Sequence, residues 1–364
     1  MAEDFGALAA SPVGGTSVGG TSLSAAPACS DWARSQDLSP IGSAGHYQGY
    51  LLVEVPLPWP PDISEIAELT GVAQLALRAG LRLQAIAPGA TAVAGTAGGA
   101  VDQPRRLIYY GPARPGRAGP LRRRERLVGP EAEALAEAAA ELLAPPDSAP
   151  DGQVDGSADD QAAGQADGSG PVDVLVCTHG RRDACCGGRG TDLVRALAET
   201  TLSGARTWPS RLGRDGPAPE VRVWRTSHTG GHRFAPTALV LPSATLWAWA
   251  DVALLDRVVG ARGPVSEVVS RYRGCATLGP PAHQAVEKSV LAEVGWPLLS
   301  SWRLSSSLGD GWVRLATEVA GTWEGRVAEG RHVPQPECRT PPELASKQGV
   351  EWVVEELHQV APGP

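Results

Sequence analysis

The order of apolar and polar positions divides most of the chain into two stretches with the same succession of predicted elements. In the first stretch, short apolar or β-branched runs predict strands at residues 50–55, 81–86, 106–110 and 121–128. Helical patterns fall at 63–79, where Asp62 can cap the first turn, and at 130–143, which begins with a proline. The predicted order is therefore β-α-β-β-β-α.

The same order returns after residue 170, without any repeat of individual residues. Strands are predicted at 172–176, 220–225, 238–241 and 244–249, and helices at 187–201 and 251–259. Because this order is the thioredoxin-like one, the sequence predicts an α/β protein with two thioredoxin-like lobes. Further on, 264–273 and 281–294 look helical, and 302–327 carries alternating, Trp-containing runs. The pattern at 350–357 fits a strand or a short helix equally well.

The patterns and the composition of the segments between them divide the chain into five predicted parts. Residues 1–27 are rich in Gly, Ser, Ala and Thr and are predicted to be disordered, and 28–144 form a first lobe without ligands. An acidic, flexible linker is predicted at 145–170. The second lobe, with all candidate ligands, covers 171–300, and a small β-rich extension covers 301–364.

Charge and cysteine content narrow the functional class. The net charge is −8, but residues 145–170 alone hold six Asp and no basic residue, so the remainder is nearly neutral and does not indicate nucleic-acid binding. Six Cys in 364 residues do not form a disulfide scaffold. Residues 1–27 lack the pattern of a signal peptide, and Pro242 and Asp251 interrupt the most apolar window. We therefore expect a soluble, cytoplasmic protein.

The candidate chemistry lies in two short segments of the second lobe. Cys177 ends a predicted strand, and Cys186 lies at the start of the following helix, where the helix dipole favours a thiolate. His228 and His232 follow the next strand and are four residues apart, with two glycines between them. Two thiolates and two imidazoles are a complete ligand set for zinc or for a [2Fe–2S] cluster.

These segments resemble the sucrase/ferredoxin-like family, whose members are relatives of the thioredoxin-like [2Fe–2S] ferredoxins. The resemblance rests on Cys177 and Cys186 with eight residues between them, on the His-x-Gly-Gly-His phrase at 228–232, and on the early Cys29, and it covers roughly 29–300. It implies a [2Fe–2S] cluster held by Cys177 and Cys186 on one iron and by His228 and His232 on the other. The family spacing selects Cys186 rather than its neighbour Cys185. Groups expected to orient these ligands are His179, Arg182, Asp183, Gly230, Gly231 and Arg233.

Two imidazoles in place of thiolates remove two negative charges, which makes the oxidised cluster easier to reduce. Each ring can also keep a titratable N–H, so that electron and proton uptake are coupled. The sequence thus predicts an electron-transfer protein with proton-coupled one-electron chemistry and a reductase-type or ferredoxin-type redox partner, rather than a hydrolase. No residue is assigned a catalytic role.

Three alternatives remain open at this stage. The first is a structural Cys2His2 zinc module that presents the Arg-rich stretch 105–126 to a partner, although a solvated loop is the simplest explanation of that stretch. The second is a thiol–disulfide or peroxide-reducing role for Cys177 or for the Cys185–Cys186 pair. The third is a chance grouping of Cys and His without metal. The remaining cysteines, Cys29, Cys275 and Cys338, are predicted to be buried small hydrophobic residues.

Overall fold

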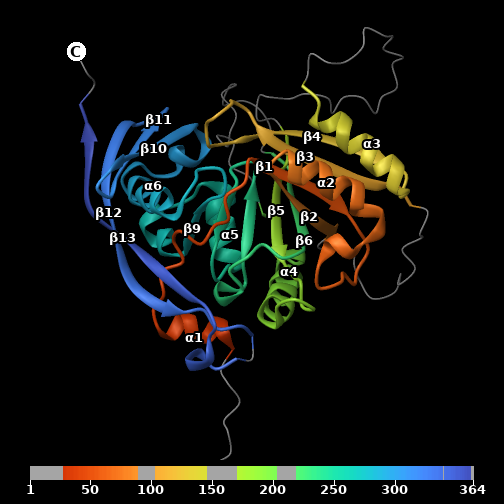
Figure 1. Ribbon diagram of the computed structural model, residues 1–364, viewed down its shortest axis with the longest axis horizontal. Coiled ribbons are helices and arrows are strands. Elements are labelled where there is room, and N and C mark those ends of the chain that lie inside the picture. Colours follow the sequence, from red (N-terminus) through yellow and green to blue (C-terminus); the bar gives the residue numbers. More distant parts are fainter. Residues whose placement is uncertain (1–27, 89–102, 146–169, 203–218, 339, 362–364) are drawn as a thin grey trace, which may run out of the picture.

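The computed structural model describes residues 28–88, 103–145, 170–202, 219–338 and 340–361. Within these ranges the protein is a mixed α/β structure with a nine-stranded sheet of order β4-β3-β1-β2-β6-β5-β7-β8-β9 and a separate four-stranded sheet (Figure 1). The segment predicted to be disordered, 1–27, and nearly all of the predicted linker lie outside the described residues. No helix in the described ranges is long and apolar enough to cross a membrane.

The first half of the large sheet is built around a parallel pair of strands. β1 pairs in parallel with β2 and antiparallel with β3, which in turn pairs with β4. Helices α2 and α3 lie side by side, and their buried residues join those of β1 in one apolar cluster. The elements are β1 (Gly49–Glu54), α2 (Thr70–Arg78), β2 (Leu81–Pro88), β3 (Arg105–Pro112), β4 (Leu121–Val128) and α3 (Ala132–Leu143).

The second half repeats this arrangement. β5 pairs in parallel with β6 and antiparallel with β7, and β7 pairs with β8. The antiparallel pairing of β2 with β6 joins the halves, and β9 (Tyr272–Cys275) extends the far edge. The elements of this half are β5 (Val172–Cys177), α4 (Thr191–Ala198), β6 (Val221–Thr226), β7 (Ala238–Leu241), β8 (Thr245–Trp247) and α5 (Val252–Gly260). Most pairings in the sheet are thus antiparallel, while each half begins with one parallel pair.

The C-terminal segment forms the second sheet, in which β10 to β13 pair antiparallel in chain order. Its strands are β10 (Arg303–Gly309), β11 (Trp312–Thr317), β12 (Gly321–Pro334) and β13 (Gln348–Val360). Helix α6 (Pro281–Val294) contacts β9 of the large sheet as well as β11, β12 and β13. The short helix α1 (Cys29–Ser35) lies beside the lower ends of β12 and β13 in Figure 1, where Arg331 donates hydrogen bonds to the carbonyls of residues 36 and 37.

Three predicted helices differ from the observed elements. The stretch 63–69 forms two short 3-10 turns, Ile63–Glu65 and Ala67–Leu69, because Ile66 between them is extended, and α2 begins only at Thr70. The helix predicted at 187–201 begins as a π-helical turn, Cys186–Gly190. The helix predicted at 264–273 was wrong: two 3-10 turns, Val265–Glu267 and Val269–Arg271, lead into β9, whose burial and pairing with β8 override the local helical preference.

Most arginines of the Arg-rich stretch lie on β3 and β4, at the strands predicted for 106–110 and 121–128, while Arg114 and Arg117 lie in the exposed loop between them. Arg106 and Arg123 form ion pairs with Glu125, and Arg123 also reaches Asp173. Arg124 donates to the carbonyl of residue 144 and lies over the Tyr109 ring. These arginines therefore have partners within the protein, which does not favour their use as a basic docking face.

Asp173 on β5 links the two halves of the large sheet through hydrogen bonds. Its fully buried carboxylate accepts hydrogen bonds from Tyr110 on β3, from the Arg222 guanidinium at 2.8 and 2.9 Å, and from Trp224 Nε1 at 2.7 Å. Asp173→Ala should lower the free energy of unfolding by about 3 kcal/mol, because it leaves Arg222 without its main counter-charge. Urea denaturation measures this change.

Asp192→Ala is the matched control. Asp192 pairs with Arg195 at 2.9 Å, but both side chains are about 70% exposed (72% and 69%), so its removal should cost less than about 0.5 kcal/mol. Equal effects of the two substitutions would show that Asp173 does not contribute to joining the halves.

Candidate metal centre

Cys177 and Cys186 are brought together by a tight turn that requires glycine. Cys177 is the last residue of β5, and a Cβ on Gly190 would lie 2.0 Å from its carbonyl oxygen. A Cβ on Gly187 would similarly lie 2.4 Å from the Cα of Gly180. Because these positions have no side chain, the chain folds back on itself and both thiols are buried next to each other.

The two thiols affect one another strongly. A hydrogen bond from Cys186 lowers the pKa of Cys177 to about 6, and the nearby His228 and the backbone amides act in the same direction against burial. The pKa of Cys186 is raised, first by its contact with Cys177 and then by burial. The pair therefore favours one thiolate at neutral pH, located on Cys177, which is the form that binds a metal.

The histidine loop starts beside Cys177, because Thr226 at the end of β6 is in register with that residue. Gly230 and Gly231 have φ values of +80° and +66°, in the left-handed region that favours glycine. A Cβ on Gly231 would also lie 2.4 Å from the Arg273 guanidinium, which donates to the Gly230 carbonyl at 3.1 Å. The buried Arg273 thus packs against the loop and stabilises its conformation. Burial lowers the pKa of this guanidinium to about 10.

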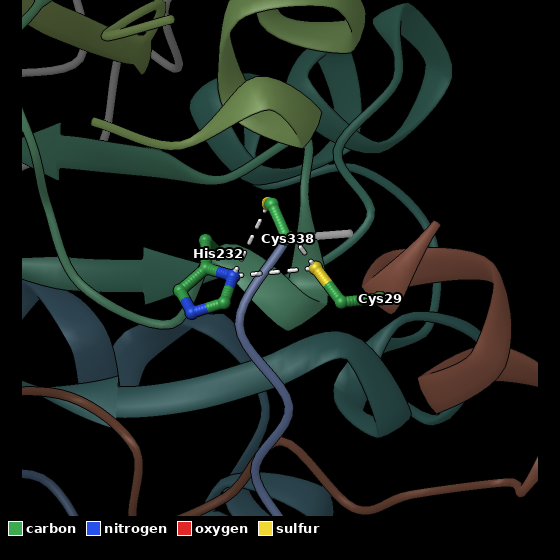
Figure 2. A group of neighbouring side chains, drawn as sticks. All are labelled: Cys29, His232 and Cys338. Carbon is green, nitrogen blue, oxygen red and sulfur yellow. Dashed lines mark hydrogen bonds between the residues drawn. The ribbon is translucent and has the colours of Figure 1, made fainter. Parts of the chain in front are cut away.

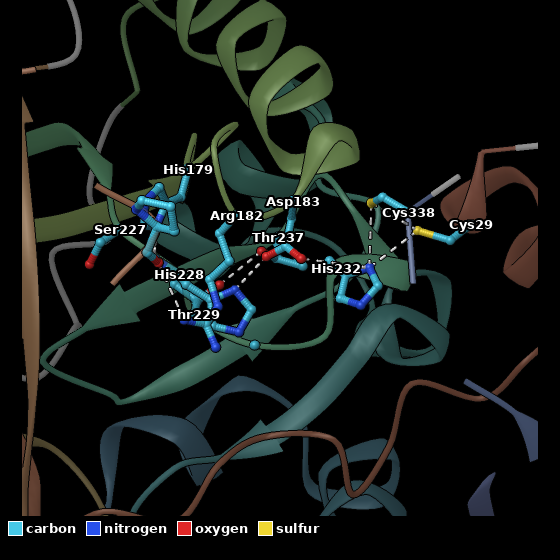
Figure 3. A network of polar contacts seen from close by, with 12 residues as sticks. Cys29, His179, Arg182, Asp183, Ser227, His228, Thr229, His232, Thr237 and Cys338 are labelled. Atoms are coloured by element: carbon cyan, nitrogen blue, oxygen red, sulfur yellow. Dashed lines mark hydrogen bonds and ion pairs between the residues drawn. The ribbon is translucent and has the colours of Figure 1, made fainter. Parts of the chain in front are cut away.

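His228 is oriented by Asp183 (Figure 3). Its Nδ1 lies 2.5 Å from Asp183 Oδ2, so Nδ1–H donates to the carboxylate and Nε2 is the nitrogen that can bind a metal. Burial acts to raise the pKa of Asp183, but the hydrogen bond and charge of His228 outweigh it and hold that pKa below its usual value. The carboxylate is therefore ionised and fixes the tautomer of the ring.

The other expected supporting residues surround this loop. His179 Nδ1 accepts a hydrogen bond from the backbone amide of His228 at 3.3 Å, while its Nε2–H donates to the Pro60 carbonyl at 2.7 Å. Arg182 donates to the carbonyl of residue 61 at 3.3 Å and so contacts the first half rather than a ligand. Arg233 packs over the Phe234 ring, and burial lowers the pKa of its guanidinium to about 10.

His232 faces a different set of thiols (Figure 2). Its Nδ1 lies 3.2 Å from Cys29 Sγ and 3.7 Å from Cys338 Sγ, and the two sulfur atoms are 3.5 Å apart. The donor atoms of these three residues all lie within 4.8 Å of one another, and together they could hold a metal ion. The prediction that Cys29 and Cys338 serve only as buried hydrophobic residues does not account for this placement.

The sequence gives little signal for this group, because 203 and 106 residues separate His232 from Cys29 and from Cys338. The one available signal was the early cysteine, which the family resemblance already included. Cys275, by contrast, is buried elsewhere, near Ser243 and Thr277, as the sequence predicts.

Cys185 joins the thiols around Cys29 rather than the Cys177–Cys186 pair. Its Sγ lies 3.3 Å from Cys29 Sγ. Hydrogen bonds from Cys29 and Cys338 lower the pKa of Cys185. The pKa of Cys29 is raised, first by its hydrogen bond with Cys185 and then by the one with Cys338. The thiols of the neighbouring residues 185 and 186 therefore have different partners: Cys185 contacts Cys29, and Cys186 contacts Cys177.

Asp183 lies between His228 and His232 (Figure 3). One carboxylate oxygen contacts His228, and the other lies 4.0 Å from His232 Nδ1. On the thiol side, Cys29, Cys177, Cys185 and Cys186 belong to one buried cluster. The structure therefore gathers thiols and imidazoles at the ends of β5 and β6.

Comparison with known proteins places these residues in a family. The family model described as sucrase/ferredoxin-like matches residues 40–274, which include the Cys177–Cys186 pair and the His228–His232 loop. Cys29 and Cys338 lie outside this match. No curated protein and no solved structure matches the chain. The match spans more than half of the sequence, and the chain therefore belongs to the sucrase/ferredoxin-like family.

Proposed function

We propose that this protein is a one-electron carrier that binds a [2Fe–2S] cluster through Cys177, Cys186, His228 and His232. The observation that carries the proposal is the shared position of the buried Cys177–Cys186 pair and of the Asp183-bound His228 at the adjacent ends of β5 and β6. Two thiolates and two imidazoles match the donor set of clusters in which His replaces Cys on one iron. When bound, such a cluster supplies reversible one-electron transfer.

The fold is consistent with this role. We propose that both halves are thioredoxin-like lobes, since each combines the β-α-β-β-β-α order with the same strand arrangement, β4-β3-β1-β2 and β8-β7-β5-β6. The four proposed ligands all come from the second half. The first half supports them through Arg82 and Gln84, which donate to the His228 carbonyl at 3.2 Å.

The four proposed ligands differ in their exposure to solvent. Cys177 and Cys186 are almost completely buried, whereas the side chains of His228 and His232 are 19% and 21% exposed. Electron transfer to a protein partner requires one edge of the site to lie near the surface. We therefore propose that a reductase-type or ferredoxin-type partner docks on the histidine side.

Metal and sulfide analysis tests the proposal. Protein purified anaerobically should contain about two iron and two sulfide per chain and show visible absorption that dithionite partly bleaches. Zinc without sulfide, in cells supplied with iron, would instead support a structural Cys2His2 zinc module. The internal pairing of Arg106 and Arg123 argues against the basic partner surface that this alternative includes.

The midpoint potential should depend on pH through His228. Asp183 holds a proton at His228 Nδ1, and reduction, which adds negative charge, favours the protonated ring. The potential should therefore fall as pH rises, by about 59 mV per pH unit where one proton accompanies one electron. Potentiometry across the pH range measures the slope.

Asp183→Asn is the informative variant for this prediction. Loss of the carboxylate charge removes an interaction that stabilises the protonated ring, so the sloping region should move to lower pH. A potential that stays constant from about pH 6 to about pH 10 in cluster-loaded protein would rule out proton exchange at His228.

A further inference from the structure

We propose a second metal site, in which Cys29, Cys185 and Cys338 bind one zinc ion together with Nδ1 of His232. The contact distances are 3.3 Å for Cys29–Cys185, 3.5 Å for Cys29–Cys338, and 3.2 and 3.7 Å from His232 Nδ1 to Cys29 and Cys338. A tetrahedral zinc ion spaces its sulfur ligands about 3.8 Å apart, and its sulfur and nitrogen ligands about 3.6 Å apart. Shifts of a few tenths of an ångström would bring Cys29, Cys338 and His232 to these separations. Cys185 contacts Cys29 but lies outside the group of donors within 4.8 Å of one another, so its thiol must move further to complete the site.

The donor set favours zinc over other common ions. Three thiolates and one imidazole form a closed Cys3His site of the structural type, with no position reserved for a substrate. Cys29 contacts both of the other thiols, Cys185 and Cys338. A disulfide could join Cys29 to only one of these partners and would leave the third thiol and His232 unexplained.

The site would fasten segments from distant parts of the chain to one another. Cys29 is the first residue of α1, Cys338 follows β12, and Cys185 and His232 belong to the loops that carry the proposed cluster ligands. Other contacts already hold α1 in this position, among them Ser30 Oγ donating to the Ala235 carbonyl and the exposed Arg189–Asp31 ion pair at 2.6 Å. Zinc would add a further link that joins α1 and the segment after β12 to these two loops.

The two proposed sites share His232. A neutral imidazole has a free lone pair on one nitrogen only, so His232 can bind both metals only as an imidazolate that has released its N–H proton to solvent. Nδ1 of His232 faces the thiols, which leaves Nε2 for the cluster. Cys29, Cys185 and Cys338, by contrast, belong to the zinc site alone, and Cys177 and Cys186 belong to the cluster alone. The metal contents of single variants therefore separate the two proposals.

Zinc and iron analysis of the full-length protein, purified from cells supplied with both metals, tests the second site. Wild-type protein should hold about one zinc per chain, and Cys29→Ser and Cys338→Ser should each reduce zinc at least about tenfold with iron unchanged. Cys186→Ser should lose the iron and keep the zinc. The matched control is Cys275→Ser, a buried cysteine that belongs to a different apolar cluster from the other thiols and should change neither metal.

Cobalt substitution of the wild-type protein gives a measurement that does not depend on the folding of a variant. Cobalt bound by three thiolates should show intense thiolate-to-metal charge-transfer bands in addition to tetrahedral d–d absorption. Wild-type protein without zinc, zinc contents equal in Cys29→Ser, Cys338→Ser and wild type, or cobalt spectra without thiolate bands would overturn the second site. None of these outcomes would affect the iron and sulfide content on which the proposed cluster depends.

Discussion

Replacing Cys186 with Ser should remove the iron–sulfur cluster, whereas replacing Cys185 with Ser should leave it in place. Cys186 is buried against Cys177, and Cys185 lies 3.3 Å from Cys29 in the other group of thiols. Loss of one cluster ligand should reduce the iron content by more than about tenfold, since removal even of groups that only support ligands costs 10- to 100-fold. Iron analysis and the visible spectrum of anaerobically purified variants measure the difference.

The neighbouring positions make each variant a control for the other, because both change a buried thiol in the same turn. Cys185→Ser should lower the zinc content instead of the iron content if the second site exists. Iron lost from Cys185→Ser and retained by Cys186→Ser would reverse the ligand assignment.

His228→Cys should lower the midpoint potential by roughly 100 mV or more, since clusters with two His ligands lie several hundred millivolts above their all-Cys relatives. The substitution replaces a neutral imidazole by a thiolate and so adds one negative charge next to the iron. The glycines at 230 and 231 allow the loop to adapt to the shorter side chain. The variant should also lose the pH dependence that depends on the His228 ring.

His358→Cys is a suitable control, since His358 lies on β13 and its side chain is 54% exposed. It adds a thiol without changing the charge at the proposed cluster, and its potential should equal that of the wild type. An unchanged potential in His228→Cys with the cluster retained would mean that His228 is not a ligand.

Much of the fold follows from local patterns. The strands at 121–128 and 238–241 and the helix at 281–294 match the observed elements, and a proline lies at or just before the start of each, at positions 120, 236 and 281. The errors fall where tertiary contacts decide. At 264–273, the pairing of β9 with β8 replaces a helix that the local sequence favours. The undecided stretch at 350–357 is part of the strand β13, which pairs with β12 along its length.

The candidate site was predictable only in part, for the same reason. Cys177, Cys186, His228 and His232 stand out because short spacings around glycines and strand ends are visible in the sequence. The positions of Cys29 and Cys338 depend on α1 and on the segment after β12 folding back onto the histidine loop. No local spacing encodes such a contact. The carboxylate of Asp183, in contrast, was expected to support the ligands and does contact His228.

Pulsed electron paramagnetic resonance of the reduced protein tests the central claim most directly. A [2Fe–2S] cluster reduced by one electron is paramagnetic, and nitrogen ligands bound to its iron give hyperfine couplings that thiolates cannot give. We predict couplings from two imidazole nitrogens in wild-type protein and from one in His228→Cys. A reduced cluster without directly bound nitrogen, or no paramagnetic cluster in protein made with iron and sulfide, would contradict the proposed Cys177, Cys186, His228 and His232 ligation.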